Sequence, residues 1–573
     1  MQDPPPDLKV KGKSRSLVGV KLALGLLALL AFLPARAPAA SPAEVQLILT
    51  LDSSGSMRHN DPRRLMPQAA GIMATLLEPQ DYLGLISFAD DSRLRLAPAP
   101  LLPRQRRRAK RELARLYPRG RYTDIYGALA AALTAFDPEG PRRRALLLLL
   151  GGRPDLAPHK GRSEDSVARV HQEIIPAYRQ AGIPIYAVAF TPESDQALLK
   201  ALAEATGGRF LFIESPDELH LAFIRIYEEL KGPQLAPLRD NQFLLDPGVN
   251  EAVLVLTRAI PGRPVTLENP QGRKIRPWNP PWPIDWLSAP GFDLVTLPHP
   301  QPGAWTVSGH KPGDSKVVLY TALKLESPLV PERLGEDEAL VAGAVLTDNG
   351  KVISDPEILG RTEFTAILKG AGGNKPLFLS LTAPGAAAAP VWPPGARVGE
   401  FPAMTGPGPR ELTVLARGKD FRRERTFFIN AAPPWYRASL KPGKPGAPTR
   451  LILQPDPARP LGELTGWLGV KRPSGALSGT FLTLKPGEGG EFAFVPDEPG
   501  RYLAMWRLAG ITPSGRSVVL NPPALPLNFS SLQVAPAPSG GLFPRPWIVL
   551  ALMLTALFLL ALGGALLKRR HSP

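Results

Sequence analysis

Residues 45–57 read VQLILTLDSSGSM, and this stretch decides the fold of the first part of the chain. Its first seven residues form a short, mostly apolar run, as in a strand that is buried on both faces. Asp52, Ser54 and Ser56 follow at once, in the spacing Asp-x-Ser-x-Ser. Polar residues of these types after a buried strand predict a loop that leads into a helix on the face of a sheet.

The downstream sequence repeats this alternation of apolar strands with helical spacing. A helix is expected after Asp61, taken as its N-cap, with Pro62 at the first helical position, and another at 125–136. The further strands are expected at 82–88, with 93–96 as its hairpin partner, and at 145–150, 183–190 and 209–213. This order predicts a doubly wound α/β domain whose mostly parallel sheet is covered on both faces.

Three blocks of this region occur in the order found in von Willebrand factor A domains. They are Asp52-x-Ser54-x-Ser56, then Gly120-Arg121-Tyr122-Thr123-Asp124, then Ala205-Thr206-Gly207-Gly208-Arg209-Phe210. Residues 43–233 therefore resemble a von Willebrand factor A domain, a Rossmann-like α/β fold. By that resemblance, a metal-ion-dependent adhesion site holds Mg²⁺ or another divalent cation, and an acidic side chain of a protein partner completes the coordination. The residues that the resemblance assigns to the metal are Asp52, Ser54, Ser56 and Thr123.

One position departs from the family pattern. Where the family has an Asp after the strand at 145–150, which holds the metal through water, this chain has Gly151. The loss of a carboxylate beside a cation removes a favourable Coulomb term of about 1 to 4 kcal/mol. Asp155 is a candidate substitute, and Asp124 lies beside Thr123.

Two interpretations of the Asp-x-Ser-x-Ser motif therefore stay open. One is a cation site built from hydroxyl and carboxylate oxygens, the donors that Mg²⁺ prefers. The other is a metal-free interaction fold, in which the same residues form an ordinary turn before the next helix.

After Gly232-Pro233 the sequence changes to alternating patterns with Pro and Gly turns, which is typical of all-β structure. A weak repeat supports this interpretation, because Pro302-Gly303-Ala304-Trp305 resembles Pro499-Gly500-Arg501-Tyr502. Its period fits immunoglobulin-like sandwiches. We expect three of them, at 235–326, 327–432 and 433–530.

The two ends of the chain carry signals for export and membrane anchoring. Residues 1–39 combine a basic start, an apolar stretch and a small-residue run, and predict a signal peptide. After a linker at 531–546, Trp547–Leu567 is uncharged and long enough for a transmembrane helix. The basic tail 568–573 predicts a cytoplasmic C-terminus. The sequence thus predicts a single-pass membrane protein with its bulk outside the cytoplasm, in the periplasm or on the cell surface.

The net charge of +17 does not by itself indicate a nucleic-acid partner, because Arg is spread along the whole chain. The most basic segment is Arg104–Arg121. A solvated helix face is the favoured interpretation of this segment, and docking on anionic lipid or polysaccharide is the alternative.

Three tryptophans, Trp278, Trp282 and Trp286, are interleaved with prolines. They could form a platform for carbohydrate or peptide. The favoured interpretation is an irregular loop whose indole rings cover the edge of a sandwich.

No motif of an enzyme is present. The seven histidines lack the H-E-x-x-H spacing of zinc proteases, and the absence of cysteine excludes thiol chemistry. There is no phosphate-binding loop or nucleophile elbow. We therefore expect an adhesion or scaffold protein; the alternative is a sensor or accessory subunit that relays partner binding to a membrane complex.

Overall fold

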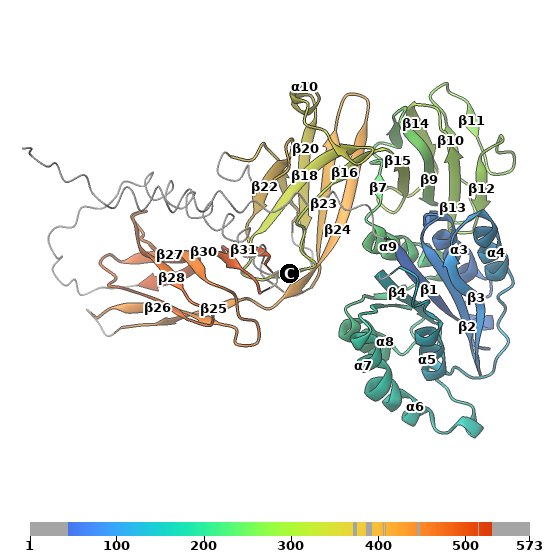
Figure 1. Cartoon of the computed structure of the whole chain (residues 1–573), viewed down its shortest axis with the longest axis horizontal. Helices are drawn as coiled ribbons and strands as arrows, with labels where there is room; N and C mark the ends of the chain where they lie inside the picture. Colours follow the sequence, from blue (N-terminus) through green and yellow to red (C-terminus); the bar gives the residue numbers. More distant parts are fainter. Residues whose placement is uncertain are drawn as a thin grey trace, which may run out of the picture.

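The computed structural model describes residues 44–529, apart from residues 142, 371–374, 386–391, 405, 407, 444–446 and 514. Figure 1 shows an α/β region at one end and β-sheet regions along the rest of the chain. The expected signal peptide, linker, membrane span and tail lie outside the described residues. Within the described ranges, no helix is both long and apolar enough to cross a membrane.

The first sheet has six strands in the order β3-β2-β1-β4-β5-β6. Neighbouring strands are parallel except for β2 and β3, which form the predicted antiparallel hairpin. Chain order reverses between β1 and β4, so the loops after these two strands meet at the carboxyl end of the sheet. This confirms the predicted doubly wound domain. The strands are β1 (Val45–Asp52), β2 (Tyr82–Phe88), β3 (Ser92–Pro100), β4 (Arg143–Leu150), β5 (Ile185–Ala189) and β6 (Phe210–Phe212).

Helices cover both faces of this sheet, because successive side chains of a strand point to opposite sides. Leu47 and Leu49 pack in one apolar cluster with α3, α4 and α9, whereas Ile48 packs in a second cluster with α5, α7 and α8. The helices of this region are α2 (Met57–Asn60), α3 (Leu65–Leu76), α4 (Pro103–Ala114), α5 (Ile125–Ala135), α6 (Ser163–Arg169), α7 (Ile175–Gln180), α8 (Gln196–Thr206) and α9 (Leu219–Lys231).

The predicted start of the helix after β1 is wrong. The short helix α2 comes first, and α3 begins only at Leu65, after Arg64 in a left-handed conformation with φ 56°. Asp61 still serves this helix, because its two carboxylate oxygens accept from the N–H groups of Leu65 at 2.7 Å and Met66 at 2.8 Å. The carboxylate thus reaches across a turn to the first helical N–H groups, and Pro62 lies outside the helix.

From residue 234 onward, the described chain consists of strands apart from the short helix α10 (Pro356–Gly360). Packed sheets enclose three successive apolar clusters. The strands around the first are β7 (Gln234–Leu235), β8 (Gln242–Leu245), β9 (Val249–Thr257), β10 (Thr266–Glu268), β11 (Lys274–Ile275), β12 (Asp285–Ser288), β13 (Phe292–Pro298), β14 (Gly303–Ser308) and β15 (Lys316–Thr321). The second group is β16 (Leu323–Glu326), β17 (Arg333–Gly335), β18 (Leu340–Asp348), β19 (Lys351–Val352), β20 (Glu363–Lys369), β21 (Leu377–Ser380), β22 (Arg397–Phe401), β23 (Arg410–Arg417) and β24 (Arg422–Ala432). The third group is β25 (Tyr436–Lys441), β26 (Thr449–Pro455), β27 (Leu464–Lys471), β28 (Leu477–Leu484), β29 (Gly490–Phe494), β30 (Gly500–Ile511), β31 (Ser517–Leu520) and β32 (Leu525–Phe529).

The β region is not separated from the α/β domain by a free linker. Strand β7 pairs with both β15 and β24, so that one continuous sheet crosses from the first β group to the second. The apolar cluster of β1, α3 and α9 also includes side chains of β9, β13 and β15: Val253, Val255, Phe292, Leu294 and Val318. The first β group therefore packs directly on the helix layer.

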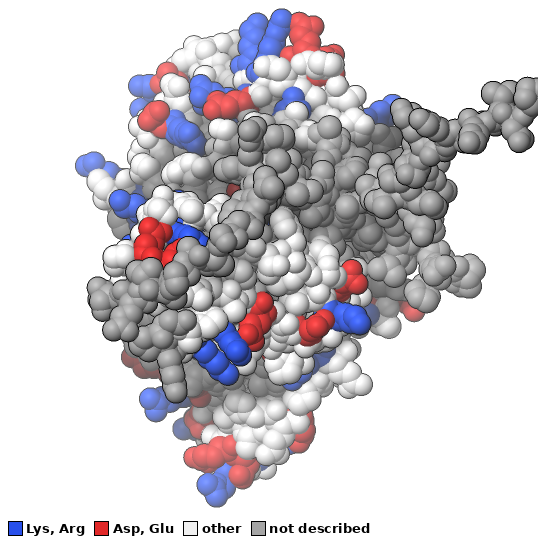
Figure 2. Space-filling model, turned by 90° about the vertical axis from the view of Figure 1, so that its left-hand side faces the viewer, with Lys and Arg blue, Asp and Glu red and all other residues white. Residues whose placement is uncertain are grey.

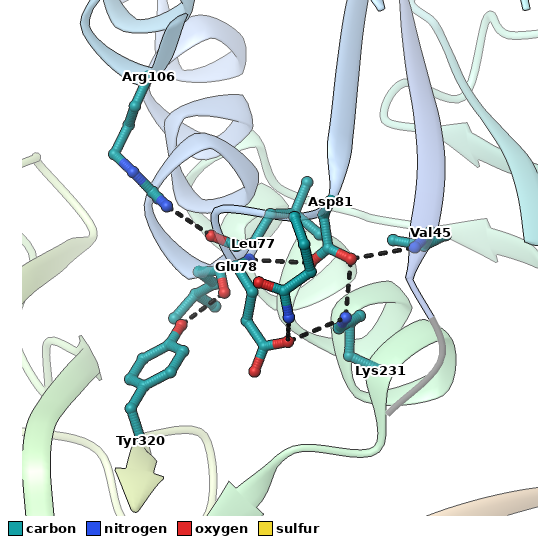
Figure 3. A network of polar contacts seen from close by, with 9 residues as sticks. Val45, Leu77, Glu78, Asp81, Arg106, Lys231 and Tyr320 are labelled. Carbon is teal, nitrogen blue, oxygen red and sulfur yellow. Dashed lines mark hydrogen bonds and ion pairs between the residues drawn. The ribbon is translucent and has the colours of Figure 1, made fainter. Parts of the chain in front are cut away.

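Buried polar contacts gather at the end of α3, and the contact from Tyr320 crosses this junction (Figure 3). The Lys231 ammonium lies 2.8 Å from the Asp81 carboxylate, and the two side chains are 2% and 0% exposed. The Tyr320 hydroxyl of β15 donates to the Leu76 carbonyl oxygen at the end of α3. Arg106 of α4 donates to three carbonyl groups at the same helix end. Such contacts satisfy backbone groups that a helix terminus leaves unpaired.

The weak sequence repeat has a structural counterpart. Gly303 and Gly500 begin β14 and β30 with φ 126° and 133°. A Cβ atom at Gly303 would lie 2.9 Å from Pro270, and one at Gly500 would lie 2.9 Å from Pro473. Each glycine therefore packs on the proline of a facing turn in the same way. These prolines, Pro270 and Pro473, lie outside the repeated stretches of sequence.

Candidate functional site

Loops from three parts of the sequence meet at the carboxyl end of the first sheet. The Arg119 N–H donates to the Ser53 carbonyl oxygen at 2.9 Å. A Cβ atom on Gly55 would lie 2.7 Å from the Gly120 carbonyl oxygen, so the two loops touch through their backbones. The loops in contact are those that follow β1, precede α5 and follow β4.

The hydroxyl groups of the Asp-x-Ser-x-Ser motif converge. The Oγ atoms of Ser54 and Ser56 are 3.0 Å apart, and Ser54 is buried whereas Ser56 is exposed. The loop after β4 lies beside them, because a Cβ atom on Gly152 would be 3.3 Å from the Ser56 Oγ. Thr123 and Asp155 connect the other two loops through a backbone bridge, with N–H···O distances of 2.6 and 3.1 Å. All four predicted metal residues thus lie on β1 or on loops that contact one another.

Asp52 is fully buried at the end of β1. One carboxylate oxygen accepts from the Ser54 N–H at 2.8 Å and the other from the Gly151 N–H at 3.0 Å. Burial raises the pKa of the Asp52 carboxyl, and the hydrogen bonds from Ser54 and Gly151 oppose that rise. A cation next to this group would stabilise its ionised form.

The space beside Gly151 is filled by apolar side chains. A Cβ atom on Gly151 would overlap the Met57 sulfur and would lie 2.8 Å from the ring of Phe190. Met57 and Phe190 are each 1% exposed. The Gly151 carbonyl oxygen in turn accepts from the side chains of Asn60 at 2.5 Å and Thr191 at 2.9 Å. A carboxylate at position 151 would therefore force the buried side chains of Met57 and Phe190 to shift.

The two other acidic candidates have different surroundings. Asp155 is exposed, and its backbone pairs with that of Thr123 next to the site. Asp124 accepts from the Gly127 N–H at 2.8 Å and so caps α5. The Lys160 ammonium lies 3.1 Å from Asp124 and 2.6 Å from Asp91. Asp124 is thus already engaged by a helix terminus and by an ammonium group.

The donor set suits a cation held largely by hydroxyl groups and water. Ser54, Ser56 and Thr123 offer hydroxyl oxygens, and Asp52 offers a buried carboxylate. In the described part of the chain, no group of three or more His, Cys, Asp or Glu side chains is arranged to hold a metal ion. A site of this composition would carry little negative charge, so its affinity for a divalent cation would be low.

Sequence inspection missed Met57 and Phe190, which determine what fits beside Gly151. Both are ordinary apolar residues at the start of a helix and just after a strand, and no local pattern distinguishes them. Lys160 was also missed, since it comes to Asp124 only through the fold.

Comparison with known proteins identifies the domain that contains this site. A family model described as the von Willebrand factor type A domain matches residues 47–153. No curated protein matches the chain.

Several solved structures are similar to parts of the chain. A von Willebrand factor type A protein from Catenulispora acidiphila has 15% sequence identity and a TM-score of 0.30, over 54% of this chain and 64% of that chain. The protein BatB from Bacteroides thetaiotaomicron has 17% identity and a TM-score of 0.24, over 32% of this chain and 100% of that chain. Proximal thread matrix protein 1 from the mussel byssus, in a structure described as having a zinc-occupied MIDAS motif, has 17% identity and a TM-score of 0.26, over 37% of this chain and 52% of that chain. The similarity thus spans less than two thirds of the Catenulispora and mussel chains.

Proposed function

Residues 47–153 of this chain are a von Willebrand factor type A domain, and from this premise we propose that the protein holds a partner protein at the carboxyl end of its first sheet. The observation that carries the proposal is the convergence of the Ser54 and Ser56 hydroxyls, 3.0 Å apart, beside the Thr123 loop. The proposed role is binding alone, without catalysis, since the sequence carries no motif of an enzyme.

We further propose a weak divalent-cation site in which Ser54, Ser56 and Thr123 supply hydroxyl oxygens and Asp52 supplies negative charge. The low charge of this set leaves the cation able to accept an acidic side chain of the partner. Asp155, next to the site, is the residue best placed to add a carboxylate. Its backbone pairing with Thr123 supports this assignment.

The proposed location is extracytoplasmic, with an N-terminal signal peptide and a single C-terminal membrane span. The domain limits expected for the β region, at 235–326, 327–432 and 433–530, are part of the same proposal. Three separate apolar clusters in these segments support it.

The cation site is tested by thermal unfolding of the full chain with and without millimolar Mg²⁺ or Mn²⁺. We expect the metal to raise the Tm of the wild-type chain, since a ligand that binds only the folded state stabilises it. The variant Ser54→Ala should lose this increase. The matched control Ser439→Ala, at an exposed serine of β25, should keep it. An unchanged Tm in the wild-type chain would remove the cation from the proposal but leave partner binding open.

Partner binding is tested with a photoreactive side chain at the exposed position 56 in intact cells. Capture of a surface or secreted protein there, and its loss in Thr123→Ala, would support an adhesion or scaffold role. A second probe beside Trp547 tests the alternative, a subunit that relays binding to a membrane complex. Capture only at that second position would favour the alternative and contradict our assignment of the binding site.

A further inference from the structure

Helix α4 presents a row of arginines to solvent. Its exposed arginines are mostly three or four residues apart, except for the neighbours Arg107 and Arg108, and therefore share one broad face of the helix. The opposite face is buried through Ala109 and Leu113. Arg106 points inward, where it donates to the carbonyl groups at the end of α3. The exposed row consists of Arg104, Arg107, Arg108, Arg111 and, one turn later, Arg115.

This row is poorly neutralised. Among the described residues, Arg104, Arg107, Arg108 and Arg111 form no ion pair, and Arg115 has only a contact of 3.4 Å with Glu112. Like charges at this spacing repel one another. By contrast, basic and acidic side chains are interspersed on the face of the molecule shown in Figure 2. The row on α4 is therefore an uncompensated positive surface that attracts a polyanion.

An exposed aromatic loop adjoins helix α4 near Lys110. Trp282, between β11 and β12, is 94% exposed, and Trp278 is 67% exposed. Three residues after Trp282, the Asp285 carboxylate lies 3.6 Å from the ammonium of Lys110 on α4. Figure 1 shows α4 beside β12. The interpretation that these indoles cover a sandwich edge is thus wrong for Trp278 and Trp282, because both rings face solvent.

The same loop adds further positive charge. Arg273, Lys274 and Arg276 are exposed, and the Arg276 guanidinium lies 5.4 Å from the centre of the Trp278 ring. Trp286 differs from its two neighbours, since its Nε1–H donates to Asp293 at 2.9 Å and fixes the ring in the fold. Helix α4 and the adjoining loop thus expose both guanidinium groups and two indole rings, and the Lys110–Asp285 ion pair connects α4 to the strand after the loop.

We propose that this surface, formed by α4 and the loop 273–282, docks on the headgroups of an anionic phospholipid membrane. Guanidinium groups pair with phosphate, and indole rings favour the boundary between headgroups and acyl chains. The exposed indoles favour a lipid surface over an acidic protein, because such a boundary takes up both the apolar ring and its polar N–H group. The inference rests on the proposed membrane anchor, which keeps the chain close to such a surface.

The test uses the full chain, which has no cysteine, so that Asn279→Cys provides a single thiol for an environment-sensitive dye. The labelled chain is reconstituted in vesicles of phosphatidylcholine, alone or mixed with phosphatidylglycerol. We expect the dye to shift to shorter wavelength and to be shielded from a water-soluble quencher only in the anionic vesicles. In about 1 M NaCl, where the Debye length is about 3 Å, most of the shift should disappear.

The variant Arg107→Gln, Arg108→Gln, Arg111→Gln should lower the ratio of docked to undocked chains on the order of a hundredfold, since each basic residue near such a surface contributes to attraction. The matched control replaces three exposed arginines of other regions, Arg417→Gln, Arg437→Gln and Arg501→Gln, and should dock as the parent does. Trp282→Ala should reduce the shielding without changing the salt dependence.

Equal dye spectra in neutral and anionic vesicles, or equal losses in both triple variants, would overturn the inference. Flotation of the chain reports separately on the anchor. A chain that fails to float with neutral vesicles but docks on anionic ones through α4 would contradict the anchor and support the docking surface. If the chain bound soluble acidic polymers in preference to anionic vesicles, the ligand of the α4 surface would be another polyanion, and the assignment to phospholipid would be refuted.

Discussion

Gly151 and Met57 are in such close contact that any side chain at position 151 would overlap the Met57 sulfur. Met57 and Phe190 occupy the space that a side chain at this position would need. The Gly151 N–H still donates to Asp52, so the backbone of the loop remains part of the site while its side-chain position is closed.

The substitution Gly151→Asp should therefore destabilise the protein and should not simply restore a metal ligand. Overpacking of a buried site costs about 1–3 kcal/mol, and a carboxylate beside Met57 and Phe190 adds a desolvation penalty. Urea unfolding of the full chain measures the loss. Combining it with Met57→Ala should recover part of the stability and increase the stabilisation by Mn²⁺. If Gly151→Asp alone bound Mn²⁺ tightly and left the free energy of unfolding unchanged, the packing described around Gly151 would be contradicted.

Removal of the buried ammonium in Lys231→Met should lower the free energy of unfolding by about 3 to 5 kcal/mol, because Asp81 is left as a buried charge without its counterion. Asp81→Asn in the same background should cost much less than it does in the parent chain. A double-mutant cycle from urea unfolding gives the coupling. Strict additivity of the two substitutions would show that the pair does not interact as its 2.8 Å separation implies.

Acid should weaken the junction between α9 and the first β group through His220. This ring stacks on Phe292, hydrogen bonds to Thr257 at 2.7 Å, and has its pKa lowered to about 4 by burial. The unfolded chain binds the proton more readily than the folded one. The contribution of neutral His220 to the free energy of unfolding is therefore fully present above the ordinary pKa of 6.5, and it is lost as the pH falls towards 4. The loss should approach about 3 kcal/mol.

The measurement is the urea concentration at the midpoint of unfolding, taken at a series of pH values from neutral down to about pH 4. The pH dependence should flatten in His220→Gln and persist in His171→Gln, which replaces an exposed histidine. If both variants retained the parent's profile, another group would be responsible.

The paired glycines of the β region should be equally intolerant of a side chain. Gly303→Ala and Gly500→Ala should each cost about 1–3 kcal/mol from backbone strain, and more from contact with Pro270 or Pro473. Gly313→Ala is the matched control, since its φ is 88° but no atom lies within 4 Å of the added Cβ. Thermal unfolding should therefore rank the control as the mildest of the three. A control as damaging as the others would rule out the proline contacts as a cause.

The sequence by itself determined the doubly wound sheet, because buried strands and helices have different periodicities that neighbouring residues reveal. It also placed Asp52, Ser54, Ser56 and Thr123 near one edge of that sheet, since parallel strands end on the same side. It missed the true start of α3 by a few residues, because the Asp61 carboxylate acts across a turn that no local pattern specifies.

Only the tertiary structure decided what surrounds these residues. Met57 and Phe190 close the space at Gly151, and Val253 and Phe292 extend the core of the α/β domain into the β region. It also left Trp282 in solvent, three residues before Asp285, whose carboxylate pairs with Lys110 of α4. These outcomes depend on packing between segments that are distant in sequence. Because protein interiors are closely packed, the side chains of one segment determine which side chains of another segment fit against them.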